Sequence, residues 1–212
     1  MQGFTLWAFR SFRRTRKLSS KLFIWVGHPR ETSLSHALAD AYQRGAESQG
    51  AEIRRMNLHD MAFDLDLTHG YNQRKDHEPA LVEFLDNTKW ADHLAWFHPL
   101  WWGGMPAKVQ GAIDRAFLPG ITFAYRENSS LWDKLLTGRT ADVMVTADTP
   151  GWFLKFMYGN AHKHRITKQV LGFCGVNVTS YSHFAAAKTA SEAKIKTWTD
   201  KAYNIGADAG RR

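Results

Sequence analysis

The sequence is short of several residue types and patterns, and each shortage excludes a class of protein. Cys174 is the single cysteine among 212 residues, so no disulfide can form within the chain, which fits a reducing compartment; we expect a cytoplasmic protein. No stretch approaches the roughly 20 apolar residues that cross a bilayer. The fingerprints G-x-G-x-x-G and G-x-x-x-x-G-K-[ST] are both absent, which argues against a dinucleotide Rossmann site and an ATP-binding P-loop.

Acidic residues are missing from the first 21 positions, which therefore carry most of the net charge. Of the formal +8, six charges come from Arg10, Arg13, Arg14, Arg16, Lys17 and Lys21, so the remaining 191 residues carry only +2. This nearly neutral body has no basic stripe of the kind that follows a nucleic-acid backbone, and we predict no nucleic-acid partner. We interpret residues 1–20 as a flexible basic leader, with membrane association through it left open, and residues 21–212 as one domain.

Metal-binding spacings are also missing, although the chain has ten histidines. His59, His69 and His77 are scattered through a polar stretch, and His162 and His164 alternate. None of them forms an H-E-x-x-H or a cysteine–histidine pattern, so we predict no metal site.

The chain alternates between short apolar runs and amphipathic segments. The apolar runs predict five strands, at 21–27, 52–58, 92–97, 142–147 and 176–181. Helical periodicity predicts helices at 33–48, 79–88, 105–117, 152–171 and 191–207, with a polar loop at 59–78. Strands that alternate with helices build right-handed βαβ units. We therefore predict an α/β protein, a three-layer α/β/α sandwich around a five-stranded parallel sheet.

Hydroxyl-bearing residues cluster where the first predicted helix begins, at Thr32, Ser33 and Ser35. Free N–H groups and the helix dipole favour an anion at such a point, and a phosphate would fit there with His28 or Arg30 as a further donor. Plain capping of the helix by Thr32 or Ser33 explains the same residues without a ligand. The local sequence is compatible with both interpretations.

The stretch His98–Pro106 (HPLWWGGMP) follows the third predicted strand and is the most specific feature of the chain. Pro99 has no N–H to donate, and the Gly-Gly pair that begins at Gly103 allows a tight turn. Free N–H groups of this loop can therefore meet the edge of a ligand, with Trp101 and Trp102 as flat walls beside it. Because ligands of such folds bind at the carboxyl ends of strands, we predict a planar heterocycle here; the alternative is that both tryptophans only pack the loop down.

With these motifs the chain resembles the NAD(P)H:quinone oxidoreductase (DT-diaphorase-like) family of flavodoxin-like flavoproteins. The matching residues of the two loops are His28, Thr32, Ser33 and Ser35, then Pro99, Leu100, Trp101, Trp102, Gly103, Met105, Pro106, Ala107 and Gly111. A G-x-x-F-A-Y element at 120–125 and a Phe-Cys-Gly at 173–175 follow in order. The resemblance covers residues 22–207. It implies a flavodoxin-like fold and NAD(P)H-dependent reduction of quinones or similar small electrophilic acceptors by ping-pong hydride transfer.

The resemblance also implies where the cofactor and the catalytic groups lie. The residues implied to hold the flavin are His28, Thr32, Ser33, Leu34, Ser35, Pro99, Leu100, Trp101, Trp102, Gly103, Thr146, Ala147, Asp148 and Thr149. Tyr125, Tyr158 and His164 are the candidate catalytic residues, and Tyr125 is implied to line the substrate pocket of the partner subunit in a homodimer. His162 is a further candidate for the histidine that supports hydride transfer in the family. The chain is shorter than those members whose extended C-terminal region contacts an adenine, and we therefore expect FMN, with FAD as the alternative.

A second function stays open beside the enzyme. Some members of this family are ancillary subunits of membrane ion-efflux systems, and the basic leader suits docking on a membrane or a protein. We keep a regulatory flavoprotein subunit as the alternative. An electron-carrier flavodoxin is disfavoured because such proteins tend to be acidic, whereas the body of this chain is nearly neutral.

Overall fold

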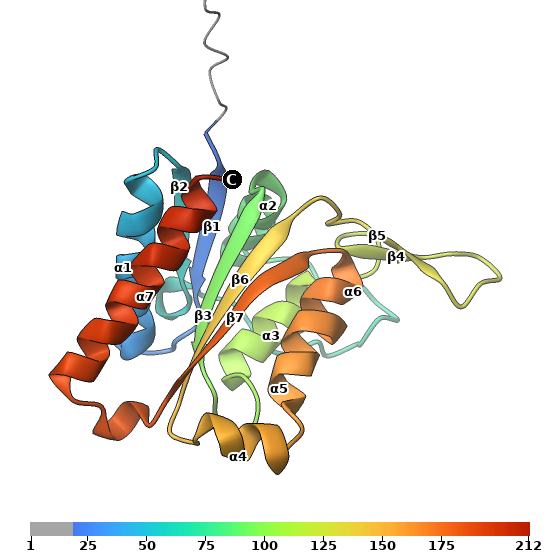
Figure 1. Ribbon diagram of the computed structural model, residues 1–212. Coiled ribbons are helices and arrows are strands. Elements are labelled where there is room, and N and C mark those ends of the chain that lie inside the picture. The colour runs from blue at the N-terminus through green and yellow to red at the C-terminus, as the bar shows by residue number, and fades with distance from the viewer. Residues whose placement is uncertain (1–18) are drawn as a thin grey trace, which may run out of the picture.

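The computed structural model describes residues 19–212, so the leader predicted at 1–20 lies almost entirely outside the described residues. Five parallel strands form one sheet in the order β2-β1-β3-β6-β7 (Figure 1). Their bounds are β1 Lys21–Val26, β2 Glu52–Asn57, β3 His93–Pro99, β6 Thr140–Ala147 and β7 Asn177–Ala185. The predicted fold class is confirmed, including the number and direction of the strands.

Helices cover both faces of this sheet (Figure 1). On one face lie α1 (Leu34–Glu47) and α7 (Glu192–Gly210), which pack side by side. On the other face lie α2 (Pro79–Trp90), α3 (Ala107–Ala116) and a continuous helical run of α5 (Ala161–His164), the π-helical η2 (Arg165–Leu171) and α6 (Gly172–Cys174). The short segments are η1 (Leu58–Asp60), α4 (Gly151–Phe156) and η3 (Ala187–Thr189). Within the described residues, no helix has the length and apolar character that a membrane span requires.

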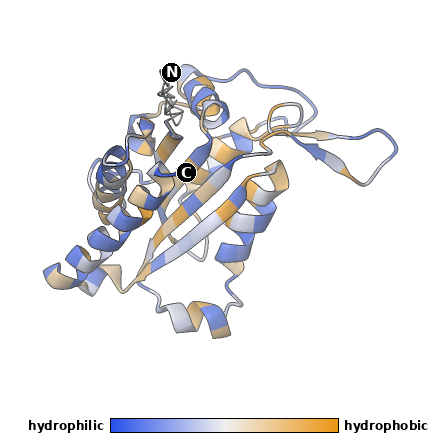
Figure 2. Cartoon of the chain, turned by 45° about the horizontal axis from the view of Figure 1, so that its top comes forward, coloured by the Kyte–Doolittle hydropathy of each residue, from blue (hydrophilic) through white to orange (hydrophobic). Residues whose placement is uncertain are grey.

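The sheet divides the core into two clusters because successive side chains of a strand point to opposite faces. Phe23 and Trp25 of β1 pack with the helices of the α2 side, whereas Leu22, Ile24 and Val26 pack with α1 and α7. All five side chains are buried, as expected for an apolar strand covered on both faces. The outer helices alternate between hydrophilic and hydrophobic residues along their length, as Figure 2 shows.

An antiparallel hairpin was missed by the sequence-based prediction. It consists of β4 (Phe123–Tyr125) and β5 (Trp132–Lys134) and projects away from the sheet in Figure 1. Three residues a strand are too few for a period-two pattern to show. The hairpin is attached through β5, where the rings of Trp132 and Phe173 stack with centroids 4.3 Å apart and Trp132 Nε1 donates to the carbonyl of Phe173.

The single helix predicted at 152–171 is two helical segments in the structure. Gly159 and Asn160 both have a left-handed backbone with φ of 55°, which ends the first segment and redirects the chain into α5. The strands also extend beyond the predicted limits, since β3 continues through Pro99 and β7 through Ala185. These extensions matter for function because they carry additional side chains to the end of the sheet described next.

Candidate active site

The loops predicted to bind a ligand come together at the carboxyl ends of β1, β3 and β6, at the bottom of Figure 1. The strand order reverses between β1 and β3, because β2 lies outside β1 while β6 and β7 lie beyond β3. The loops on either side of such a reversal leave a crevice between them. Two pockets lie at this end of the sheet.

The first pocket lies at the N-terminus of α1 and has a volume of about 320 Å³. Its lining residues are His28, Arg30, Ser33, Leu34, Ser35, Pro99, Leu100, Trp101, Thr146, Ala147, Asp148, Ala187 and Lys188. Ser33 caps α1, and its side chain accepts a hydrogen bond from the N–H of His36. Capping and ligand binding are therefore compatible, because the cap uses only one of the N–H groups that a helix N-terminus leaves free.

Two histidines beside this pocket are held in their neutral form. The imidazole of His28 is buried, and burial together with the charges of Arg30 and His36 lowers its pKa from 6.5 to about 4. Burial and the charge of Arg55 likewise lower the pKa of His36. His28 Nδ1 accepts a hydrogen bond from the N–H of Arg30 at 3.1 Å, so its Nε2 carries the proton and can donate.

The loop after β3 forms a tight two-residue turn. The N–H and carbonyl of Trp101 pair with those of Gly104, with both N···O distances 2.9 Å. The two residues at the tip, Trp102 and Gly103, have φ of 51° and 74°. A left-handed tryptophan costs roughly 1–2 kcal/mol, and this one is also fully exposed to solvent. Such strain at an exposed aromatic residue is typical of a functional position.

The second pocket lies on the other side of this turn and has a volume of about 770 Å³. Its lining residues are Leu100, Trp102, Gly103, Thr149, Gly151, Leu154, Tyr158, Asn160, Ala161, His162, Lys163, Tyr181 and His183. Leu100 lines both pockets, so they adjoin at this residue. A ligand with an anionic end and a flat end can therefore extend from one pocket into the other.

Three histidines lie at or beneath the second pocket: His98 in β3, His162 in α5 and His183 in β7. The rings of His98 and His162 meet edge to face with centroids 5.0 Å apart. Burial lowers the pKa of His98 to about 4, and burial with the charge of His98 lowers that of His162 to about 3. Burial also lowers the pKa of His183. All three rings are thus neutral at pH 7.

These histidines leave hydrogen-bonding capacity unused. Nε2 of His98, both ring nitrogens of His162 and Nε2 of His183 are buried without a protein partner. Unpartnered buried polar atoms are uncommon in proteins and cost free energy. The two that line the pocket, His162 and His183, are therefore suited to donate to or accept from a bound ligand.

Most of the residues predicted for the flavin lie in one or other pocket. Thr32 is the exception, since it is exposed and lines neither. Of the candidate catalytic residues, Tyr158 lines the second pocket, whereas Tyr125 lies on the projecting hairpin, 64% exposed, and lines neither pocket. His164 does not line the second pocket but an adjoining groove along β7, described below.

Several lining residues were not singled out from the sequence. Lys188, Tyr181 and His183 come from the last strand and the turn after it, and that strand was predicted to stop at Tyr181. Of the two histidines that the sequence offered for the support of hydride transfer, the fold places His162, not His164, in the second pocket. Among residues 19–212, no group of three or more histidine, cysteine, aspartate or glutamate side chains could hold a metal ion.

Comparison with known protein families matches the geometry. The family model described as flavodoxin-like fold covers residues 20–204. The chain belongs to this flavodoxin-like family. The strand order, with the site at the reversal between β1 and β3, agrees with that of flavodoxins.

Individual relatives of this flavodoxin-like protein are distant. The uncharacterized NAD(P)H oxidoreductase YcaK of Escherichia coli is 26% identical over 110 residues, 50% of this chain and 56% of that protein. FMN-dependent NADH:quinone oxidoreductase 3 of Bacillus anthracis is 31% identical over 105 residues, 48% of this chain and 47% of that protein. The chain thus spans about half the length of these two relatives. The crystal structure of Smu.1420 from Streptococcus mutans matches with a TM-score of 0.76 and 26% identity, covering 89% of this chain and 99% of that one.

Proposed function

We propose that this flavodoxin-like protein is an FMN-dependent NAD(P)H oxidoreductase that reduces quinones or similar small electrophilic acceptors. The observation that carries the proposal is that the two pockets meet at Leu100, one at a helix N-terminus and the other beside a tryptophan-bearing turn. FMN combines a phosphate at one end with a planar heterocycle at the other. The names of the two curated relatives, one NAD(P)H-dependent and one FMN-dependent, support the same assignment.

The donor set of the first pocket fits a phosphate. Ser33 and Ser35 bring hydroxyl groups, the first turn of α1 brings free N–H groups, and Arg30 and Lys188 bring positive charge. The one carboxylate in the lining, that of Asp148, already accepts the N–H of Lys188 at 2.8 Å. A helix N-terminus stabilises an anion by about 0.3–1 kcal/mol at an exposed position. The stabilisation is larger where water is excluded.

The turn after β3 fits the edge of a ring. Within residues 19–212 the N–H groups of Trp102 and Gly103 have no hydrogen-bond acceptor, and a Cβ added at Gly103 would meet nothing within 4 Å. These N–H groups are free to hold a ring edge on which negative charge accumulates. When bound, FMN supplies the redox chemistry, accepting a hydride from NAD(P)H and passing two electrons to the acceptor.

The second pocket supplies groups for the oxygens of a quinone. Reduction of a quinone to a hydroquinone adds two electrons and two protons, so a donor beside the acceptor's oxygen assists it. Tyr158 carries a hydroxyl, and a neutral His162 carries one ring N–H. We assign the donation of hydrogen bonds to the acceptor's oxygens to these two residues, and not to His164, because His164 lines the groove along β7 instead.

We also propose that the protein is a homodimer in which Tyr125 completes the substrate pocket of the partner subunit. Its exposure on a projecting hairpin supports this, since most of this aromatic side chain is left uncovered within its own subunit. Sedimentation analysis should report a dimer, and Tyr125→Ala should raise the KM for a quinone while FMN stays bound. A monomer with full activity would contradict the proposal.

The deciding experiment loads the protein with FMN and adds NAD(P)H without oxygen, while the visible absorption band of the flavin is followed. We expect the band to bleach and to return when a quinone is added. Since both substrates use the second pocket in turn, initial rates should give parallel double-reciprocal lines. Protein that does not retain FMN, or retains it without reduction by NAD(P)H, overturns the proposal.

A pair of arginine variants tests the cofactor end separately. Arg30→Gln removes a charge from the first pocket and should weaken FMN binding about fivefold, the size expected for an exposed charge pair. Arg44→Gln removes a charge from the exposed side of the same helix and should leave FMN binding unchanged. Fluorescence titration of FMN measures both.

A further inference from the structure

A groove of about 1300 Å³ runs along β7, the last strand of the sheet. We call it the β7 groove. Its walls are residues 177–181 of β7 on one side and η2 with α6 on the other, and β5 of the hairpin contributes at one end. The catalytic roles proposed above involve no side chain of this groove, although it is larger than either pocket of the candidate active site.

The lining of the β7 groove carries positive charge and no negative charge. Lys134, Lys163 and Lys168 line it together with His164, and no aspartate or glutamate does. Within residues 19–212 none of the three lysines forms an ion pair. Like charges gathered without counter-ions raise the local positive potential, which favours an anionic ligand.

Aromatic side chains lie among these cations. Trp132 and Phe173 both line the β7 groove, and their rings are stacked with an interplanar angle of 17°. Lys134 Nζ lies 6.0 Å from the centre of the Trp132 ring, and Lys163 Nζ lies 5.7 Å from that of Tyr181. Cations beside flat apolar faces match a ligand that has both phosphates and a ring, such as a nucleotide.

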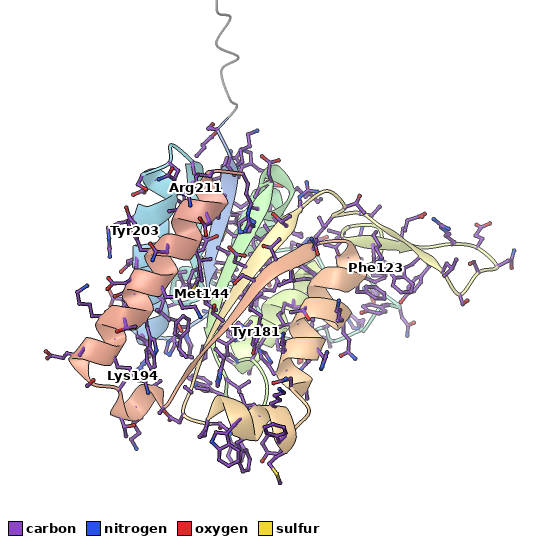
Figure 3. The ribbon with its side chains drawn as sticks, in the orientation of Figure 1. Phe123, Met144, Tyr181, Lys194, Tyr203 and Arg211 are labelled. Carbon is purple, nitrogen blue, oxygen red and sulfur yellow. The ribbon has the colours of Figure 1, made fainter. Side chains whose placement is uncertain are left out.

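The β7 groove is continuous with the second pocket of the candidate active site. Lys163 and Tyr181 line both. Figure 3 shows Tyr181 on β7, between the strand and the α5–α6 helical run. A ligand whose reactive ring occupies the second pocket can therefore extend past Tyr181 and place its remaining part in the groove.

We propose that the β7 groove binds the ADP half of the reduced nicotinamide dinucleotide while the nicotinamide occupies the second pocket. The inference rests on the proposed function, which supplies the dinucleotide as a substrate. It assigns Lys168, Lys134 and His164 to the phosphates and the Trp132 end of the groove to the adenosine. It also explains how a chain without the G-x-G-x-x-G fingerprint holds a dinucleotide.

The test compares two hydride donors that differ only in the ADP half. Reduced nicotinamide riboside lacks this half, whereas NADH carries it. The variants Lys168→Gln and Lys134→Gln each remove one charge from the groove without touching the second pocket. Each should raise the KM for NADH about fivefold, with kcat unchanged, and the double variant should raise it further. The KM for the riboside should not change.

A control and a binding measurement complete the design. Lys201→Gln removes a charge from the exposed surface of α7, on the opposite face of the sheet, and should alter neither KM. Isothermal titration calorimetry of the full-length chain with ADP should show weaker binding in the two groove variants than in the wild type. Lys201→Gln should bind ADP with the wild-type affinity.

The outcomes separate this inference from the proposed function. If ADP does not bind, or if the groove variants change the two donors' KM values equally, the β7 groove is not the ADP site. If ADP binds, and its affinity falls in the groove variants, while NAD(P)H fails to reduce bound FMN, the groove binds nucleotides but the proposed oxidoreductase activity is overturned. Binding of an acidic peptide in preference to ADP would also overturn the inference.

Discussion

The imidazole of His93 and the carboxylate of Asp142 are in buried contact at the end of the sheet opposite the candidate active site, with His93 Nε2 3.1 Å from Asp142 Oδ2. Both side chains are 1% exposed. Tyr42 of α1 donates to the same carboxylate oxygen, and Thr179 of β7 donates to the other, at 2.8 Å. The pair thus joins α1, β3, β6 and β7 through a single carboxylate.

Removing that carboxylate should destabilise the fold strongly. Asp142→Ala leaves the buried side chains of His93 and Tyr42 without this acceptor, and removing one partner of a buried polar pair in this way costs about 3–5 kcal/mol. Chemical denaturation should show this loss in the free energy of unfolding. Asp133→Ala breaks the exposed pair with Arg126 and should cost about 1 kcal/mol or less. Equal losses in the two variants would contradict the role given to Asp142.

The same carboxylate makes the free energy of unfolding depend on pH in the acidic range. Burial alone would raise the pKa of Asp142, but the hydrogen bonds and charge of His93 and the bonds from Thr179 and Tyr42 outweigh it and lower the pKa. A lowered folded-state pKa contributes stability above the unfolded pKa, and this stability is lost as the pH falls through the folded value. Asp142→Asn should therefore lose part of the acid dependence of unfolding that the wild type shows.

His98 should contribute a second, separate acid dependence. Its pKa is about 4 in the folded protein, against 6.5 when exposed. Between these values the unfolded chain binds a proton that the folded one does not, so stability falls by about 1.4 kcal/mol per pH unit as the pH decreases. His98→Phe should reduce the measured slope by this amount over that range. Urea unfolding at a series of pH values would test it, and an unchanged slope would refute it.

The contact between α1 and α7 should tolerate no added side chain. A Cβ at Gly206 would lie 2.0 Å from the carbonyl oxygen of Tyr42, and one at Gly45 would lie 2.0 Å from that of Tyr203. Because these neighbours are backbone atoms, the helices themselves must separate. Gly206→Ala should cost roughly 3 kcal/mol, the upper part of the range for overpacked sites. Asn204→Ala, on the exposed side of α7, should change stability by less than about 0.5 kcal/mol, and thermal unfolding measures both.

Trp102 should show a conflict between stability and binding. Its left-handed backbone is strained, and Asn-Gly is the residue pair that such a two-residue turn favours. Trp102→Asn should therefore raise the free energy of unfolding by about 0.5–1 kcal/mol. It should at the same time raise the KM for a quinone, since it removes a wall of the second pocket. A variant that gains stability and keeps its KM would show that Trp102 is not part of the site.

Much of the fold could be predicted from the sequence because its signals are local. The apolar run of β1, the periodicity of α1 and α3 and the glycine-bent turn after β3 each depend on residues a few positions apart. In α3 the residues Val109, Ala112, Ile113 and Ala116, which recur at helical spacing, are all buried. The flavodoxin-like sheet follows from the alternation of such segments.

The rest of the site depends on contacts between distant parts of the chain. No local pattern brings His162 against His98, or Tyr181 against Lys163, because those contacts form only when the α5–α6 run packs on the sheet. The polar loop before α2 is a similar case, since Arg115 of α3 holds it by donating to the carbonyls of Asp64 and Asp76.

The sequence by itself thus determined the α/β sandwich and the two loops that follow β1 and β3, since backbone preferences and the burial of apolar faces act over short stretches. Only the tertiary structure decided that His162 and not His164 lies in the second pocket, that Tyr125 lies outside it, and that three lysines share the β7 groove. The physical reason is that side chains from separate elements meet only once the sheet and its helices have packed.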